Sequence, residues 1–232
     1  MTIRRVILFD IDGTILSTSA TEESERRRYV DTIRDVVGVE PSVAPWRFAG
    51  MVDPQICKIL LTELGLSDNE VKTFLPKVLA RMGGVYRDME KTVTLNRGVR
   101  RLLAILASST DYITGILTGN LTAVAEEKLS VTAVRAYFSE LFCANGYFDR
   151  RSLVEDAVRT CVAKHELNGR GDVVIVGDTP RDVEAANTSK ATSVGVASGS
   201  YTTSQLSEAG AKYVYPNLEP TNELLEGLGV KR

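Results

Sequence analysis

The stretch "FDIDGT" places two carboxylates, Asp10 and Asp12, directly after a short apolar run. That run, Val6–Phe9, is bounded by a turn signal, which predicts a fully buried strand. Two carboxylates this close repel each other, so a divalent cation is the obvious means of compensating their charge. The alternative is an acidic turn that merely ends the strand. The rest of the chain has to decide between these interpretations.

Two further apolar runs also end in residues that could do chemistry. "GILTGN" ends in Thr118, Gly119 and Asn120, and "VVIVGDTPRD" carries Asp178 and Asp182. In an open parallel sheet, ligands bind outside the carboxyl ends of the strands, near a topological switch point. If these strands are neighbours, carboxylates, a hydroxyl and free helix N-terminal amides converge there. Such amides bind phosphate, and oxygen ligands of this kind suit Mg²⁺.

The elements that must position these residues follow an alternating pattern. Apolar runs predict five strands, at residues 6–9, 112–117, 173–177, 192–197 and 213–215. Helical spacing of apolar residues covers 98–108 and also 152–163, which opens with a capping-box pattern. This alternation favours an α/β fold with a Rossmann-like parallel sheet that carries helices on both faces.

One interval breaks the alternation. Residues 17–92 are far longer than one crossover helix needs and contain several helical segments. One of these segments begins at Asp53 and Pro54, and Pro76 should kink or shorten another. We therefore expect a small helical cap domain at 17–92, inserted after the first strand, and a catalytic core formed by 1–16 and 93–232.

Composition excludes several classes of function. The chain has 232 residues and a net charge of −2, so no global basic field indicates binding to nucleic acid or membrane. It has no apolar run of transmembrane length and no signal-peptide pattern. Three scattered cysteines fit a reducing cytosol, and the single histidine, His165, excludes a histidine-rich zinc site. We expect a cytoplasmic monomer or homodimer whose chemistry depends on carboxylates.

The three strand-end motifs together resemble those of a known family. "DIDGT", "LTGN" and "GDTPRD", in this order, are similar to the motifs of haloacid dehalogenase (HAD) superfamily hydrolases, and the insert lies where that family places its helical cap. "GMVDPQI" and "SVGVASGSY" resemble the phosphoglycolate-phosphatase-like group within it. The resemblance covers the whole predicted core.

The resemblance implies a role for each carboxylate. Asp10 would be the nucleophile that forms an aspartyl-phosphate, and Asp12 would protonate the leaving alkoxide and then activate water. Asp10, Asp12 through its backbone carbonyl, and Asp178 would hold Mg²⁺, with Asp182 as a direct or water-mediated ligand. Asp182 has a competing interpretation, because Thr179, Pro180 and Asp182 also resemble a helix start.

The resemblance also implies which residues bind phosphate. Thr118 and the amides of Gly119 and Asn120 would contact the phosphoryl oxygens, and Thr14 is a further candidate for substrate binding. Thr118 could instead simply end a strand.

The cationic residue departs from the family's pattern. The usual lysine–proline pair before the third motif is replaced by "FDRRSLVEDA". Arg150 is our candidate for the phosphate-binding cation, ahead of Arg151 and Lys164. In the insert, Arg47 could meet a second anionic group of the substrate.

The sequence thus predicts a Mg²⁺-dependent hydrolase of a small phosphorylated metabolite, with phosphoglycolate suggested by resemblance alone. A phosphomutase would use the same aspartyl-phosphate but would need a bisphosphate activator. Dehalogenation is disfavoured, because displacement at a carbon–halogen bond needs no second acid and this chain has one in Asp12. A non-catalytic binding module would typically lack the nucleophile or a metal ligand, and the long insert does not suit a receiver-type phospho-acceptor domain.

Overall fold

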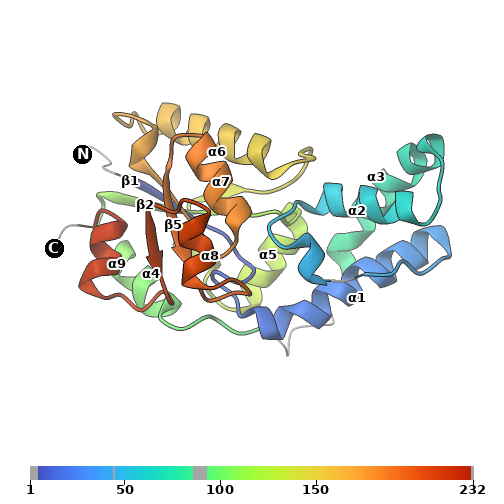
Figure 1. Ribbon diagram of the computed structural model, residues 1–232, viewed down its shortest axis with the longest axis horizontal. Helices are drawn as coiled ribbons and strands as arrows, with labels where there is room; N and C mark the ends of the chain where they lie inside the picture. The colour runs from blue at the N-terminus through green and yellow to red at the C-terminus, as the bar shows by residue number, and fades with distance from the viewer. Residues whose placement is uncertain (1–4, 44, 86–92, 231–232) are drawn as a thin grey trace.

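The computed structural model describes residues 5–43, 45–85 and 93–230. Within these residues a six-stranded sheet has the order β3-β2-β1-β4-β5-β6, with every neighbouring pair parallel. Figure 1 shows this sheet in the left part of the molecule, with helices around it. The strands are β1 (Arg5–Phe9), β2 (Tyr112–Leu117), β3 (Glu140–Phe142), β4 (Val173–Gly177), β5 (Thr192–Val196) and β6 (Tyr213–Tyr215). The predicted α/β fold is confirmed.

The strand order explains why the predicted site residues lie together. β1 pairs with β2 on one side and with β4 on the other, so the order reverses at β1. The carboxyl ends of these three strands therefore flank a topological switch point, where open α/β sheets bind ligands. β1 can occupy this central position because its apolar residues Val6–Phe9 are buried on both faces.

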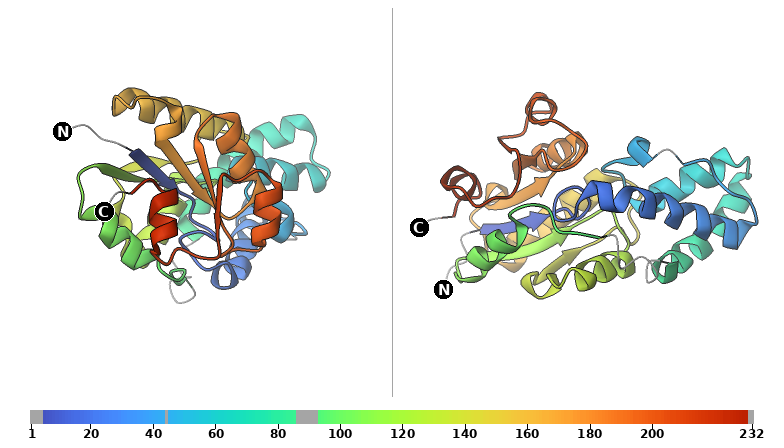
Figure 2. Two further views of the ribbon diagram at one scale, coloured as in Figure 1. Left: turned by 60° about the vertical axis from the view of Figure 1, so that its left-hand side comes forward. Right: turned by 90° about the horizontal axis from the view of Figure 1, so that it is seen from below.

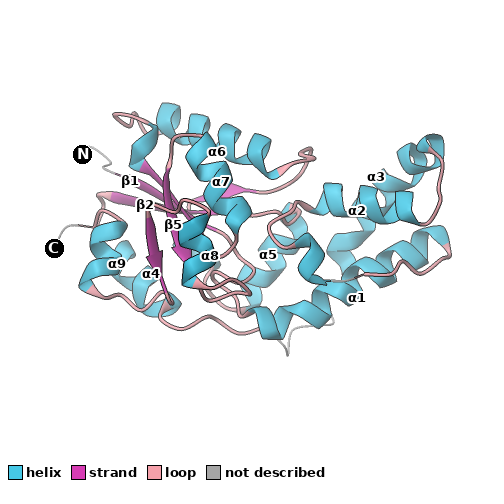
Figure 3. Ribbon diagram, viewed as in Figure 1, coloured by secondary structure: helices cyan, strands magenta, loops and turns pink. Residues whose placement is uncertain are grey.

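Helices cover both faces of the sheet (Figure 3). On one face, apolar side chains from α4 (Val99–Ala107), α5 (Thr122–Val131) and α9 (Asn222–Gly227) share a hydrophobic core with the sheet. On the other face, α6 (Arg150–Lys164) and α7 (Pro180–Thr188) build a second core. The short helix α8 (Thr203–Glu208) packs beside β5 and β6.

The described part of the insert contains three helices. It projects beyond one end of the sheet (Figure 2). The helices are α1 (Thr18–Val37), α2 (Asp53–Glu63) and α3 (Asp68–Val85), with a 3₁₀ turn at Pro45–Phe48. Their apolar faces form a third hydrophobic core, which Leu121 and Val124 of the sheet domain join. α3 continues through Pro76, which lies on its exposed side. Among the described residues, no helix has both the length and the apolar character of a membrane span.

One short segment of the insert, residues 49–53, packs into the sheet domain. Val52 is fully buried in the core beneath α6 and α7. A Cβ on Gly119 would lie 2.2 Å from the carbonyl oxygen of Met51, and one on Gly50 would lie 2.5 Å from Thr179 Oγ1. This segment is therefore in van der Waals contact with the loops that follow β2 and β4.

Candidate active site

The loop after β1 holds Asp10 and Asp12 in a tight turn. The Asp10 amide donates to the carbonyl of Val176 in β4 at 2.9 Å, which continues the sheet up to the carboxylate. Gly13 has φ +78°, and a Cβ there would lie 2.1 Å from Asp178 Oδ2. A glycine is thus required both for the left-handed backbone and for the close approach of Asp178. The Asn96 side chain fixes the turn by donating to three of its carbonyl oxygens.

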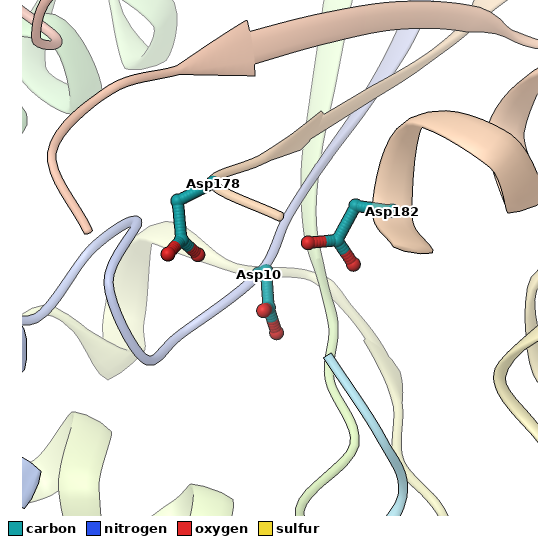
Figure 4. A group of neighbouring side chains, drawn as sticks. All are labelled: Asp10, Asp178 and Asp182. Carbon is teal, nitrogen blue, oxygen red and sulfur yellow. The ribbon is translucent and has the colours of Figure 1, made fainter. Parts of the chain in front are cut away.

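Three buried carboxylates meet at the switch point. Asp10 comes from the end of β1, Asp178 from the end of β4 and Asp182 from the first turn of α7, and Figure 4 shows Asp178 and Asp182 on either side of Asp10. One ligand oxygen from each lies within 4.8 Å of the others. The structure therefore brings together the three residues that the strand-end motifs predicted to be neighbours.

This arrangement is electrostatically unfavourable without a positive charge. The pKa of Asp10 is raised from 3.8 to about 7, chiefly by burial and also by the charges of Asp182 and Asp12, while Arg150 acts in the opposite direction. Burial and the same neighbouring carboxylates hold the pKa of Asp178 well above its usual value, against a hydrogen bond from Thr14. Clustering of this kind is typical of functional sites.

Arg150 supplies one compensating charge. Its Nη2 lies 3.4 Å from Asp10 Oδ1 and 2.7 Å from Asp182 Oδ1, and it donates to the carbonyl of Leu117 at 3.1 Å. Arg151 is exposed, and Lys164 pairs with Glu140 instead. Of the three cations considered from the sequence, the structure brings only Arg150 to the carboxylates.

The carboxylate cluster fits a divalent metal ion. All of its potential ligands are oxygens, which suits Mg²⁺. Asp182 Oδ2 accepts from Thr179 in a capping box, so the helix-start interpretation of Asp182 holds for that oxygen. Oδ1 is fully buried and, although close to Arg150, no donor among the described residues meets it with hydrogen-bond geometry. That oxygen faces the cluster with bonding capacity to spare.

The loop after β2 forms the opposite wall of the site. Thr118 is fully buried, and its Oγ1 accepts from Asn120 Nδ2 at 2.8 Å. Asn120 Nδ2 also donates to Asp12 Oδ2 at 2.7 Å. Thr118, Gly119 and Asn120 all line the cavity that Asp10 borders, so the structure brings the second strand-end motif to the carboxylates.

Lys128 on α5 also reaches this site, and it was missed in the sequence analysis. Its side chain is 0% exposed, and its Nζ lies 2.8 and 2.7 Å from Asp12 Oδ1 and Oδ2. A signal was available, because residues 124, 125, 128 and 129 share the buried face of α5. A lysine on that face needs a polar or anionic partner.

Two sequence candidates for substrate binding lie elsewhere. Thr14 is fully buried behind Asp178 and donates to its Oδ1 at 3.2 Å, so it orients a carboxylate and does not line the cavity. Arg47 is half exposed on the outside of the cap and pairs with Glu63. It, too, is absent from the cavity lining, because the 3₁₀ turn directs it away from the site.

A cavity of about 150 Å³ lies between the site and the cap. It is small beside the roughly 300–1,000 Å³ of typical ligand pockets. The core side of its lining consists of Asp10, Asp12, Thr118, Gly119, Asn120, Arg150, Asp178, Thr179 and Ser200. The cap side combines apolar and polar residues, namely Val43, Phe48, Ala49, Gly50, Met51, Ile56, Arg26, Arg28, Tyr29 and Asp53.

Asp53 joins the cap to the loop that follows β2. Its carboxylate accepts from both terminal nitrogens of Arg28 at 3.1 Å, from Tyr29 Oη at 2.6 Å and from the Leu121 amide at 2.8 Å. Its own amide donates to the Gly119 carbonyl at 2.7 Å. Arg28 is 0% exposed, so this ion pair is fully buried.

The raised pKa of Asp10 gives a testable pH dependence. Because the folded protein binds the Asp10 proton more tightly than the unfolded chain, this residue lowers the free energy of unfolding as the pH rises from 3.8 to about 7. The slope is at most about 1.4 kcal/mol per pH unit for each proton. We expect metal-free wild type to lose stability over this interval relative to Asp10→Asn, measured by urea unfolding in EDTA. If the free energy of unfolding changed with pH in the same way for both proteins, the raised pKa of Asp10 would be contradicted.

Comparison with solved structures places the fold. A predicted phosphoglycolate phosphatase from Haemophilus somnus 129PT has a TM-score of 0.70 at 19% identity, covering 94% of this chain and 96% of that chain. A hydrolase from Pseudomonas syringae has a TM-score of 0.72 at 22% identity, covering 97% of this chain and 98% of that chain. CbbY from Rhodobacter sphaeroides, in complex with phosphate, has a TM-score of 0.73 at 16% identity, covering 99% of this chain and 100% of that chain. At these identities the likeness shows the fold.

The family follows from the sequence itself. A comparison with curated proteins gives no match. The sequence model of the haloacid dehalogenase-like hydrolases matches residues 7–196, a range that runs from β1 through β5 and includes all three strand-end loops. The resemblance that the motifs indicated is confirmed, and the chain belongs to the haloacid dehalogenase-like hydrolase family.

Proposed function

We propose that this protein is a Mg²⁺-dependent hydrolase of small phosphomonoesters that acts through an aspartyl-phosphate on Asp10. The observation that carries the proposal is the pairing of two carboxylates with different surroundings. Asp10 is buried against Arg150, whereas Asp12 is about one-third exposed and faces the cavity. Two carboxylates in unlike environments can divide nucleophilic and acid–base roles between them.

In the first step, an Asp10 oxygen attacks phosphorus while the bond to the leaving oxygen breaks. Asp12, in its protonated form, gives its proton to that oxygen. In the second step, water attacks phosphorus, Asp12 takes the proton of the water, and the bond to Asp10 breaks to release phosphate. Two carboxylates are needed because Asp10 is covalently blocked during the second step.

The remaining residues stabilise charge on the phosphoryl group. Arg150 Nε is a buried donor without an acceptor among the described residues, and a phosphoryl oxygen beside Asp10 would supply one. Thr118 and the amides of Gly119 and Asn120 provide further donors. Mg²⁺ held by Asp10, Asp178, the Asp12 carbonyl and Asp182 would offset negative charge on the same oxygens.

The cavity indicates a small leaving group. Its volume of about 150 Å³ leaves little room beyond a phosphoryl group and a few heavy atoms. Arg26 lines the cap side, which supports a substrate with a polar or anionic end, whereas the charge of the neighbouring Arg28 is paired with Asp53. Phosphoglycolate is the first compound of this kind to test. Its candidacy also draws on the name of the Haemophilus somnus relative.

The test is phosphate release from a panel of small phosphomonoesters, phosphoglycolate included, with Mg²⁺ or with EDTA. We expect turnover with Mg²⁺, loss of at least 100-fold in EDTA, and a ranking that favours the smallest esters. Turnover that requires a catalytic bisphosphate and returns phosphate to a sugar would identify a phosphomutase instead. No turnover by folded, Mg²⁺-loaded protein would contradict the proposal.

A further inference from the structure

Lys128 brings a buried positive charge to the carboxylate of Asp12. It lies on α5, on the same face as Val124, Ala125 and Leu129, which pack into the hydrophobic core. Burial of an ammonium is costly unless partners compensate it. Here Nζ lies within 2.8 Å of both oxygens of Asp12 and 3.0 Å from Asn120 Oδ1.

Asn120 completes this contact with Asp12. Its Oδ1 accepts from Lys128, and its Nδ2 donates to Asp12 Oδ2 at 2.7 Å and to Thr118 Oγ1 at 2.8 Å. The opposite amide orientation would turn the NH₂ group toward the ammonium, so the network fixes the orientation. Asp12 is thus held by donors from two separate elements.

The two reacting carboxylates are served by different cations. Arg150 contacts Asp10 and Asp182, whereas Lys128 contacts Asp12. The Asp12 side chain is 31% exposed and borders the cavity, so packing alone leaves it room to rotate. A shift of 1 Å in a reacting group can cost roughly 100-fold in rate, which makes such fixation valuable.

We propose that Lys128 is a positioning residue that holds Asp12 where its proton passes to the leaving oxygen. This inference rests on the proposed function. Lys128 forms and breaks no covalent bond and transfers no proton: the Asp12 proton goes to the leaving oxygen as phosphorus bonds to Asp10. Because Nζ reaches both Asp12 oxygens, contact with one of them persists whichever oxygen carries the proton.

The test compares two substrates in wild type and Lys128→Met. An alkyl phosphate such as phosphoglycolate needs a proton on its leaving oxygen, whereas p-nitrophenyl phosphate releases a stable phenolate. We expect kcat/KM to fall about 100-fold for the alkyl phosphate and less than about 10-fold for the aryl phosphate. Equal losses on both substrates would mean that Lys128 only maintains the structure, and would overturn the proposal.

Two further variants separate positioning from packing. Leu129→Ala removes a buried neighbour on the same helix, so it should lower the Tm and keep the wild-type ratio of the two kcat/KM values. When Asp12 is already replaced by Asn, adding Lys128→Met should lower kcat/KM for the alkyl phosphate by less than about 3-fold further, because Lys128 acts through Asp12. An additive loss there would overturn the proposal.

Should Lys128→Met fail to fold, Lys128→Gln keeps an uncharged donor that is one bond shorter, and it should show the same substrate dependence with a smaller loss. The absence of any such dependence in a folded Lys128→Gln variant would contradict the inference. Wild-type turnover on both substrates establishes the proposed function independently. If wild type shows none, the proposed function fails and this inference fails with it.

Discussion

Asp10→Asn is expected to lower the rate of phosphate release by about 10⁵–10⁶-fold, the size of loss that follows removal of a covalent nucleophile. Asparagine has the shape of aspartate but cannot form the acyl-phosphate. Asp10 is buried beside Asp178 and Asp182, so the substitution also removes a carboxylate from a repulsive cluster. The metal-free variant should therefore unfold at a Tm no lower than that of wild type.

Both measurements are needed to interpret this variant. Phosphate release with Mg²⁺ and the most active ester of the panel gives the rate, and thermal unfolding in EDTA gives the Tm. Activity above about 1% of wild type would exclude Asp10 as the nucleophile. A large fall in Tm with the loss of activity would instead assign Asp10 a structural role.

Asp53→Asn is expected to cost about 3–5 kcal/mol of unfolding free energy, the usual result of breaking a buried ion pair. The Asp53 carboxylate accepts from Arg28, Tyr29 and the Leu121 amide. An amide NH₂ at this position cannot accept from the donors that face it. For a chain of this size, the loss corresponds to a fall in Tm of roughly 6–20 °C.

The cap offers a matched control for this substitution. Asp35 pairs with Arg81 at 3.0 Å, but both side chains are largely exposed. Asp35→Asn should therefore change the unfolding free energy by about 0–1 kcal/mol. Similar small effects for Asp53→Asn and Asp35→Asn, measured by urea unfolding, would show that the buried pair does not stabilise the cap.

The sheet, and the position of the site at the carboxyl ends of its strands, could be predicted because buried parallel strands appear in the sequence as continuous apolar runs. "VVIVG" coincides with β4, and Val6–Phe9 fills all but the first residue of β1. Polar residues placed directly after such runs lie at the carboxyl ends of the strands, which brings Asp10 and Asp178 together. β3 was missed because one of its three residues is Glu140, which interrupts the apolar run. β6 is just as short and is also an edge strand, but all three of its residues, "YVY", favour a strand.

Local capping was harder to predict. The pattern at Ser152 indicated a helix start there, but α6 begins at Arg150 because the Asp149 carboxylate caps the Ser152 amide at 2.7 Å. The two-residue difference matters, since it places Arg150 in the first turn, from which it reaches Asp10. Several residues near Ser152 could cap a helix, and the sequence does not rank them.

Contacts between distant segments were the least predictable. Lys128 follows Asn120 by two helical turns, and only the three-dimensional course of α5 shows that both reach Asp12. Arg47 was proposed from the sequence to meet a second anionic group of the substrate. Its direction depends on the 3₁₀ turn at Pro45–Phe48, which pairs it with Glu63 on the outer surface.

The packing of residues 49–53 has a consequence for engineering chimeras. By sequence, this segment lies in the middle of the insert, and a graft of residues 17–92 would transfer it intact. In the folded protein, however, Val52 is buried in the core of the sheet domain, and Met51 lies against Gly119. A transplanted cap would thus bring a foreign piece into the interior of its host. Exchange of the insert therefore requires two cut points more than the sequence suggests, one on each side of 49–53.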